Sequence, residues 1–285
     1  MVVSKPAKSI TEIKCSSKNQ TFLLISDVHF DSVYCERKLL KETLDEALEK
    51  EAIVLFNGDF FDLMQGKNDR RGSKSNIRKE YLGDNYFDLV IQDAYEFLKP
   101  YAKIIAIMAD GNHETAITKH NETNPLDRWC YVLRKEAGSP VEHTGYQSWV
   151  AVRLKIDKEN FQSFIIKMHH GAGGNARVTK GVIEHNRMST YVHGADLIWL
   201  AHTHTQYAMH STTERISKSG DWKVMLDKVY HIRTGCWKQE YKEGGWSVEK
   251  GFSPSEIGGY WLELEAKREA RTEVGRYIKT RIYPT

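Results

Sequence analysis

The sequence predicts an α/β fold in which a β-α-β unit comes first and a series of strands follows. Residues 21–25 and 52–56 are short apolar runs with the character of buried strands. Between them, residues 36–50 place leucine and alanine at helical spacing on one face. In the C-terminal half the pattern changes to strand-like segments, which favours a second sheet.

A second helix and a third strand extend this first unit. The helix is expected over residues 86–99, where apolar residues recur at helical spacing and a proline follows at once. The strand is expected over residues 103–108. Asn124 then resembles an N-cap, with Pro125 at the first helical position and Gly138 ending the helix.

The C-terminal half reads mainly as strands. They are expected over residues 148–156, 163–168, 197–201, 229–233 and 259–265, with one helical stretch near residues 181–192. No linker or internal repeat divides the sequence. We therefore expect one domain over residues 21–285, preceded by an N-terminal extension, residues 1–20, and carrying an inserted basic segment, residues 65–84.

Composition is ordinary for a globular enzyme domain. The 285 residues are 40% hydrophobic and 28% charged. No apolar run approaches the ~20 residues that a membrane-spanning helix needs, and the N-terminus lacks the apolar region of a secretory signal. The four cysteines show no CxxC spacing and are expected to be reduced thiols. We therefore expect a cytoplasmic protein, and the formal net charge of +3 does not by itself indicate nucleic-acid binding.

Five short polar clusters follow the apolar runs in order. They are Asp27-Val28-His29, Gly58-Asp59-Phe60-Phe61-Asp62, Gly111-Asn112-His113-Glu114, Met168-His169-His170-Gly171 and Ala201-His202-Thr203-His204. Neutral imidazole suits first-row transition metals, whereas carboxylate and carboxamide oxygens suit harder ions such as Mn²⁺ and Mg²⁺. The mixture favours a redox-silent Lewis-acid centre.

The side-chain donors suffice for two ions if one carboxylate is shared. They are Asp27, His29, Asp59, Asn112, one of His169 and His170, His202 and His204. Asp59, beside the small Gly58, is the natural bridge. Two ions roughly 3.5–4 Å apart can share a hydroxide and hold the attacking and leaving oxygens of an in-line displacement at phosphorus. The clusters therefore predict hydrolysis of a phosphate ester.

As a set, the clusters span residues 27–204 and resemble the signature of the calcineurin-like metallophosphoesterase superfamily. The resemblance implies an α/β/β/α sandwich, in which two facing mixed β-sheets are flanked by helices and the active site lies on loops at one sheet edge. It also implies a hydrolase acting on phosphate ester bonds through a binuclear metal centre.

The same resemblance implies a role for each polar residue of the clusters. One ion is expected to be held by Asp27, His29, Asp59 and His204, and the other by Asp59, Asn112, His169 and His202. His113 resembles the family's general acid, which protonates the departing alkoxide. Asp62 resembles the residue that hydrogen-bonds this imidazole and fixes its tautomer.

Two residues depart from the patterns of the family and its branches, and one ligand position has two candidates. Ala201 stands where the family pattern has glycine, and its methyl group is tolerable in an extended segment. Leu63 follows Asp62 where protein serine/threonine phosphatases carry arginine, which argues against that branch. Either His169 or His170 can be the fourth-cluster ligand, and we favour His169 as the first residue past its strand. The ligand set favours Mn²⁺ and also accommodates Fe, Zn²⁺, Ni²⁺ or Mg²⁺.

The substrate class depends on the segments between the clusters. The form of residues 58–62 resembles the repair-nuclease branch, and the basic segment that follows can neutralise backbone phosphates. Its basic residues are Lys67, Arg70, Arg71, Lys74, Arg78 and Lys79. The leading hypothesis is therefore a phosphodiesterase acting on DNA or RNA. If the segment is instead a solvated insertion, a small-molecule phosphatase or phosphodiesterase acting on nucleotides is favoured.

Two further segments bear on the choice. The glycine-rich residues 171–177, with Lys180 nearby, either contact a phosphate or form a loop without ligand contact. Aromatic residues between Trp237 and Trp261 either stack bases or fill the core. A third hypothesis is a non-catalytic binding scaffold, against which the presence of every expected ligand type and of His113 argues.

Overall fold

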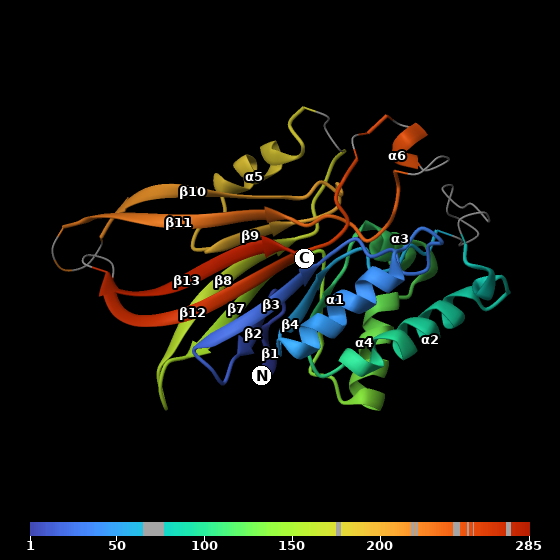
Figure 1. The fold of residues 1–285 in the computed structure, drawn as a ribbon, viewed down its shortest axis with the longest axis horizontal. Helices are drawn as coiled ribbons and strands as arrows, with labels where there is room; N and C mark the ends of the chain where they lie inside the picture. Colours follow the sequence, from blue (N-terminus) through green and yellow to red (C-terminus); the bar gives the residue numbers. More distant parts are fainter. Residues whose placement is uncertain are drawn as a thin grey trace.

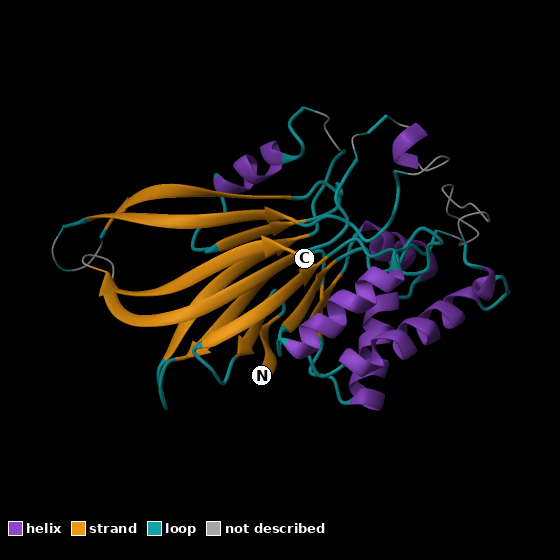
Figure 2. Cartoon of the chain, viewed as in Figure 1, coloured by secondary structure: helices purple, strands orange, loops and turns teal. Residues whose placement is uncertain are grey.

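The computed structural model describes residues 1–64, 77–174, 178–217, 220, 222–241, 246–249, 251–252, 254–271 and 275–285. Two mixed β-sheets stack on each other, with helices against their outer faces (Figures 1 and 2). The predicted fold class is confirmed. Among the described residues, no helix is long and apolar enough to cross a membrane.

One sheet has seven strands in the order β1-β2-β7-β8-β9-β11-β10, and the other has six in the order β13-β12-β3-β4-β5-β6. The strands are β1 (Val2–Ala7), β2 (Ile10–Lys14), β3 (Asn19–Ile25), β4 (Ile53–Asn57), β5 (Ile105–Ala109), β6 (Glu142–Thr144), β7 (Gln147–Lys155), β8 (Phe161–His169), β9 (Leu197–Leu200), β10 (Tyr207–Ile216), β11 (Val224–Arg233), β12 (Tyr260–Arg271) and β13 (Gly275–Pro284). The helices are α1 (Arg37–Glu49), α2 (Tyr86–Leu98), α3 (Asn112–Asn121), α4 (Pro125–Ala137), α5 (Val182–Ser189) and α6 (Trp246–Glu249), with 3₁₀ turns at Lys79–Tyr81 and Lys99–Tyr101.

Strand alternation divides the apolar side chains between two cores. On β3, Phe22 and Leu24 belong to the core between the sheets, while Leu23 and Ile25 belong to the core under the helices. Strand β4 alternates in the same way. Because β3 and β4 are buried on both faces, their sequences are continuous apolar runs rather than alternating ones.

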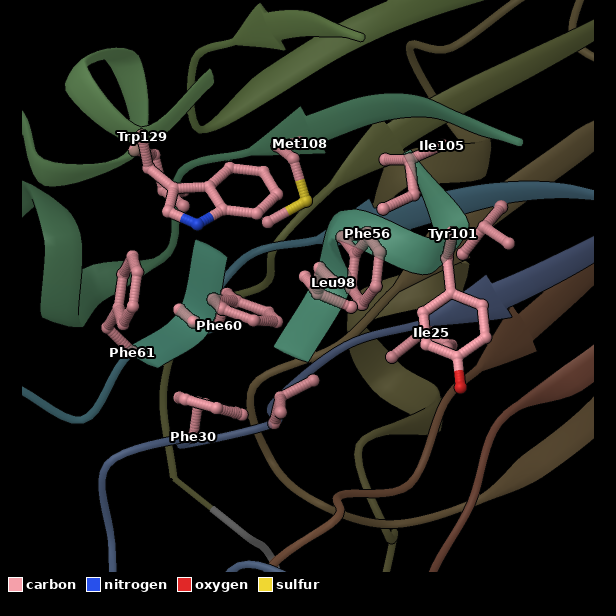
Figure 3. Packing of buried hydrophobic residues seen from close by; sticks show 14 of the residues in the cluster. Ile25, Phe30, Phe56, Phe60, Phe61, Leu98, Tyr101, Ile105, Met108 and Trp129 are labelled. Atoms are coloured by element: carbon pink, nitrogen blue, oxygen red, sulfur yellow. The ribbon is translucent and has the colours of Figure 1, made fainter. Parts of the chain in front are cut away.

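Helices α2 and α4 cover the outer face of the six-stranded sheet. Figure 3 shows Phe56 of β4 and Met108 of β5 packed with Leu98 of α2 and Trp129 of α4. Trp129 is fully buried, so its truncation to alanine is expected to cost ~3–5 kcal/mol. This layer gives the loops at the strand ends a rigid base.

The N-terminal residues correct one expectation. Residues 1–20 were predicted to be an extension, but β1 and β2 lie within them and form one edge of the seven-stranded sheet. Strand β2 pairs in parallel with β7, and its Ile13 is fully buried between the sheets. Because this strand buries only alternate residues, it carries no continuous apolar run that would predict it.

The parallel strands bring the clusters to one place. Strands β3, β4 and β5 are parallel to one another, as are β8 and β9. Since parallel strands end at the same edge of a sheet, the segments that follow them meet there. In Figure 2, loops gather between the strand ends and α3.

Candidate metal centre

The five clusters converge into two adjoining groups of ligand-type side chains. We call Asp27, His29 and His204 subsite A. We call Asp59, Asn112, His170 and His202 subsite B, in which Asn112 Oδ1 lies 3.3 Å from His170 Nε2. The subsites adjoin, since His170 Nε2 is 3.9 Å from Asp27 Oδ1.

Five of these residues have a left-handed backbone. Positive φ angles occur at Asp27 (51°), His29 (49°), Asp59 (50°), His202 (75°) and His204 (57°). Such angles are uncommon for residues other than glycine and cost of order 1–3 kcal/mol each. The surrounding structure must therefore hold these residues in place, and strain of this kind concentrates at functional sites.

Two glycines permit the close approach of the loops. A Cβ on Gly58, whose φ is 85°, would lie 2.3 Å from His170 Nδ1. A Cβ on Gly111 would lie 2.1 Å from Asp59 Oδ1. Both positions therefore require glycine for a side chain of subsite B to reach its place.

Carboxylates orient the imidazoles of subsite A. His29 Nδ1 lies 2.8 Å from Asp62 Oδ1, and His204 Nδ1 lies 2.9 Å from Glu240 Oε2. The Nε2 atoms of both rings then face each other at 3.3 Å. A carboxylate partner of this kind fixes the ring and strengthens it as a metal ligand.

Asp27 supplies a buried acceptor of the kind that binds a cation. Its Oδ2 accepts from Ser26 Oγ and from the His202 backbone N–H, but its buried Oδ1 has no hydrogen-bond partner. His204 Nε2 lies 3.4 Å from this oxygen. Although burial opposes it, the neighbouring imidazoles of His204 and His170 lower the pKa of Asp27, so it is a carboxylate. A buried unpaired carboxylate oxygen beside two imidazoles fits a divalent ion.

Backbone carbonyls orient the imidazoles of subsite B. His170 Nδ1 donates to Asn57 O at 2.8 Å, and His202 Nε2 donates to Gly173 O at 3.0 Å. The opposite nitrogen of each ring is then the one able to bind a metal. His170 Nε2 lies 3.2 Å from Asp59 Oδ2.

Asp59 belongs to subsite B, and its charge also acts on Asp27 of subsite A. Its Oδ1 accepts from the His113 backbone N–H at 2.9 Å, which leaves Oδ2 directed at the centre. Burial opposes its ionisation, but the imidazoles of His170 and His113 hold the pKa of Asp59 well below its usual range. The donor set of the two subsites therefore fits a pair of divalent ions.

The fourth cluster contributes His170 and not His169, contrary to our expectation. Strand β8 continues through His169, so its side chain alternates away from that of the buried Met168. His169 Nδ1 instead accepts from the Gly171 backbone N–H at 2.9 Å. His170 is the first residue past the strand and is fully buried beside Asp59. The error lay in placing the end of β8 one residue early.

Asp62 holds His113 by a different atom from the expected one. His113 Nδ1 donates to the Asp62 main-chain carbonyl at 2.5 Å, while the Asp62 carboxylate is hydrogen-bonded to His29. His113 Nε2 is 3.9 Å from Asp59 Oδ2, so the imidazole reaches the centre without belonging to either subsite. His29, Asp62 and His113 also form a ligand-type group. Their hydrogen bonds to one another instead indicate that Asp62 orients the two imidazoles.

Sequence reasoning missed Glu240 and Lys238. Lys238 Nζ lies 3.4 Å from Asp62 Oδ1 and 3.6 Å from Glu240 Oε1, so one ammonium pairs with both carboxylates that orient subsite A. Although burial opposes it, attraction to Glu240 raises the pKa of His204 well above its usual value. Both residues lie in an irregular segment after β11, where no periodicity or motif signals them.

Two buried carboxylates shape the loop that carries Asp59. Glu114 accepts from the backbone N–H groups of Gly111, Asp59 and Phe61 at 2.8, 3.1 and 3.0 Å. Asp31 accepts from those of Asp62 and Leu63 at 2.6 and 3.0 Å. The glutamate three residues after Gly111 resembles a capping box, which is the signal that could have revealed its role.

The segments expected to contact substrate are described only in part. Within the basic segment, Lys67, Arg70, Arg71 and Lys74 lie outside the described residues, as do residues 175–177 of the glycine-rich segment. Arg78 donates to Ser32 O and Cys35 O, both at 3.0 Å, whereas Lys79 and Lys180 are exposed. Trp237 and Trp261 are buried in the core under the helices.

Comparison with known proteins identifies a family. Residues 20–206 match the sequence profile of the calcineurin-like phosphoesterases. No curated protein matches the chain. Among solved structures, it is similar to a conserved predicted phosphoesterase from Streptococcus pneumoniae, with 10% identity, a TM-score of 0.31 and coverage of 94% of this chain and 98% of that one.

Two further solved structures resemble the chain at a similar level. A Thermotoga maritima protein has 14% identity, a TM-score of 0.31 and coverage of 92% and 99% of the two chains. Vps29 from Chaetomium thermophilum has 10% identity, a TM-score of 0.34 and coverage of 93% and 98%. Similarity at this level says nothing about the activity of this chain.

Proposed function

Because the chain belongs to the calcineurin-like phosphoesterase family and is therefore a metal-dependent hydrolase of phosphate esters, we propose that it is a phosphodiesterase acting on nucleic acid. Subsites A and B would hold two divalent ions, with Asp59 as the carboxylate available to both and Mn²⁺ the favoured metal. Bound there, the ions would supply Lewis acidity for activating water and for neutralising charge at phosphorus.

His113 is proposed as the general acid. The Asp62 carbonyl holds its Nδ1, so the ring is oriented with Nε2 towards the centre. From there Nε2 can give its proton to the oxygen that leaves phosphorus. The ring also packs edge-on against His29, with centroids 4.9 Å apart, which restricts its movement.

The pairing of cations near the centre supports a diester substrate. Lys238 is ion-paired to Asp62 and Glu240, and the fully buried Arg233 is ion-paired to Glu184. Neither of these two cations is free to bind the second negative charge of a terminal phosphate. A phosphodiester carries one charge at phosphorus and makes no such demand. Within the described part of the chain, this pairing supports the proposal of a diesterase over a monoesterase.

The choice of nucleic acid rests on the form of residues 58–62 and on the basic character of residues 65–84. One observation favours the alternative, a phosphodiesterase or phosphatase acting on nucleotides. Arg78 is engaged with backbone carbonyls, so the described part of that segment offers a free charge only at Lys79. A polymer has to be bound along its backbone, and a nucleotide does not.

The test compares the wild-type chain with Asp59→Asn in the presence of Mn²⁺. Substrates are end-labelled single-stranded and duplex DNA and RNA, a panel of mononucleotides and bis(p-nitrophenyl) phosphate. Asp45→Asn is the control, since Asp45 pairs with Lys41 on α1. We expect cleavage of a polymer that Asp59→Asn lowers by roughly 10³-fold, equivalent to about 4 kcal/mol of lost transition-state stabilisation.

The other outcomes are equally informative. Hydrolysis of small esters alone, sensitive to Asp59→Asn, would establish the nucleotide alternative. No hydrolysis of any ester by a protein that retains two Mn²⁺ ions would contradict the proposed activity. The product ladder from a cleaved polymer would distinguish an exonuclease from an endonuclease.

A further inference from the structure

A fully buried arginine lies behind the turn that carries His202 and His204. Arg233, the last residue of β11, donates through Nη1 to the Ala201 carbonyl and, at 2.9 Å, to Thr203 Oγ1. Arg233 therefore hydrogen-bonds to the residues on both sides of His202. Because His202 and His204 both have positive φ, this turn is strained and requires such support.

The other arm of Arg233 reaches α5. Its Nη2 donates to Glu184 Oε2 at 2.6 Å and to Gly181 O at 3.4 Å. Gly181 has a φ of 79°, and a Cβ there would lie 3.2 Å from the Arg233 guanidinium carbon. The start of α5 is thus built to approach this arginine closely.

Glu184 connects the arginine to the loop after His170. Its second oxygen, Oε1, accepts from the Ala172 backbone N–H at 2.9 Å. The next residue, Gly173, offers the carbonyl that accepts from His202 Nε2. These contacts form a closed path around His202. The path runs from its imidazole through the loop of Ala172 and Gly173 to Glu184, and from there through Arg233 to the residues on either side of His202.

We propose that Glu184 and Arg233 act as a positioning pair for subsite B. The pair fixes both the strained backbone of His202 and the carbonyl that selects its tautomer, so that Nδ1 is the nitrogen presented to the metal. The inference rests on the proposed assignment of His202 as a metal ligand.

Glu184 and Arg233 support different parts of the centre. Glu184 connects to the centre through the Gly173 loop and through Arg233, whereas Arg233 also supports the turn on which His204 lies. His204 is oriented separately by its hydrogen bond to Glu240. Loss of Glu184 should therefore affect subsite B selectively.

The test measures Mn²⁺ binding directly by equilibrium dialysis and titration calorimetry on the full chain. Glu184→Ala is compared with wild type and with Glu12→Ala. Glu12 is a matched control because its side chain is 19% exposed, against 21% for Glu184, and pairs with Lys14 and Arg153 on the same sheet. Glu184→Gln keeps one acceptor oxygen and serves as the conservative variant.

We expect wild type and Glu12→Ala to bind two ions and Glu184→Ala to keep one at full affinity. The second should bind about 10–100-fold more weakly, as is usual when a group that orients a ligand is removed. Glu184→Gln should fall between. Nitrogen-15 NMR of the metal-free protein should also show the His202 ring losing its fixed Nε2–H tautomer in Glu184→Ala.

Three results would overturn the inference. Equal binding of both ions by wild type and Glu184→Ala would remove the positioning role. Equal weakening of both ions, accompanied by a lower melting temperature in EDTA, would show a general structural role; if Glu184→Ala does not fold, Glu184→Gln decides between these. Absence of Mn²⁺ binding by wild type would instead contradict the metal centre itself, and with it the proposed function.

Discussion

Subsites A and B lie side by side but are supported by different kinds of group. The imidazoles of subsite A, His29 and His204, are held by the carboxylates of Asp62 and Glu240. Those of subsite B, His170 and His202, are held by backbone carbonyls. The first support adds negative charge beside the metal position, and the second adds only a dipole.

This difference indicates how the two ions would differ. A carboxylate partner makes an imidazole more basic and attracts the cation, so subsite A should bind its ion more tightly. Lys238 limits the excess charge by pairing with both carboxylates. Subsite B depends instead on the exact course of two loops, which is why a positioning pair matters there.

The largest effect should come from His170→Ala. It removes a proposed ligand of subsite B, so activity should fall on the order of 10⁴-fold, equivalent to about 5 kcal/mol of transition-state stabilisation. Mn²⁺ stoichiometry should drop from two to one. The neighbouring His169→Ala is the control, since His169 does not reach Asp59, and it should keep both ions. If His169→Ala loses an ion and His170→Ala does not, our assignment is reversed.

His113→Ala should slow turnover while leaving both subsites filled. General acid catalysis contributes roughly 10²–10⁴-fold, most for substrates with poor leaving groups. The rate should therefore fall steeply for alkyl esters and little for nitrophenyl esters, with Mn²⁺ stoichiometry unchanged. His120→Ala, an exposed histidine on the same helix, is the control. A uniform loss across all esters would contradict the proton-donor role.

Glu240→Ala should lower the Mn²⁺ affinity of subsite A, just as Glu184→Ala should lower that of subsite B. Removal of the carboxylate leaves His204 without its Nδ1 acceptor, so Mn²⁺ affinity at one position should fall about 10–100-fold. The ion whose affinity Glu240→Ala leaves unchanged should be the one that Glu184→Ala weakens. Calorimetric titration of the two variants and of their double mutant checks this. If both variants weaken the same ion, the division into two separately supported subsites is wrong.

These supports were also the part of the centre that the sequence did not predict. The ligand-type residues follow apolar runs that predict β3, β4 and β5 in the first sheet and β8 and β9 in the second, and parallel pairing within each sheet then brings them together. Glu240 lies 36 residues beyond His204 in an irregular segment, so no spacing rule reaches it. The carbonyls of Asn57 and Gly173 are backbone atoms, which carry no signal in residue type.

The remaining differences between the predicted and the observed elements have two causes. One strand end was misplaced by a residue, and the apolar patterns of some elements are too weak to predict them. His169 was preferred because the end of β8 was placed one residue early, and strand ends are the least certain feature of any assignment. Helix α3 begins at Asn112 and carries few apolar residues, so its periodicity is too weak to predict it. Strand β10 exposes alternate residues over its first half and every residue of its second half, and β2 buries only alternate residues. Neither strand therefore has the continuous apolar run that predicted β3 and β4.

The smallest expected effect is a loss of folding stability at acidic pH, caused by a buried histidine on α5. His185, one residue after Glu184, is fully buried, with Nδ1 2.7 Å from Tyr207 Oη and its ring against His231. Burial and repulsion from Arg233 lower the pKa of His185 to about 3 from an ordinary value of 6.5. Between these values the unfolded chain binds a proton that the folded chain does not, so stability falls as pH drops below 6.5.

Substitution by glutamine removes this titration. Each pH unit below 6.5 costs the wild type up to about 1.4 kcal/mol, so His185→Gln should show a smaller fall in melting temperature between pH 7.5 and pH 5, by a few degrees. The exposed His193→Gln should behave as wild type. Measured in EDTA, equal slopes for all three proteins would remove His185 as a source of acid sensitivity.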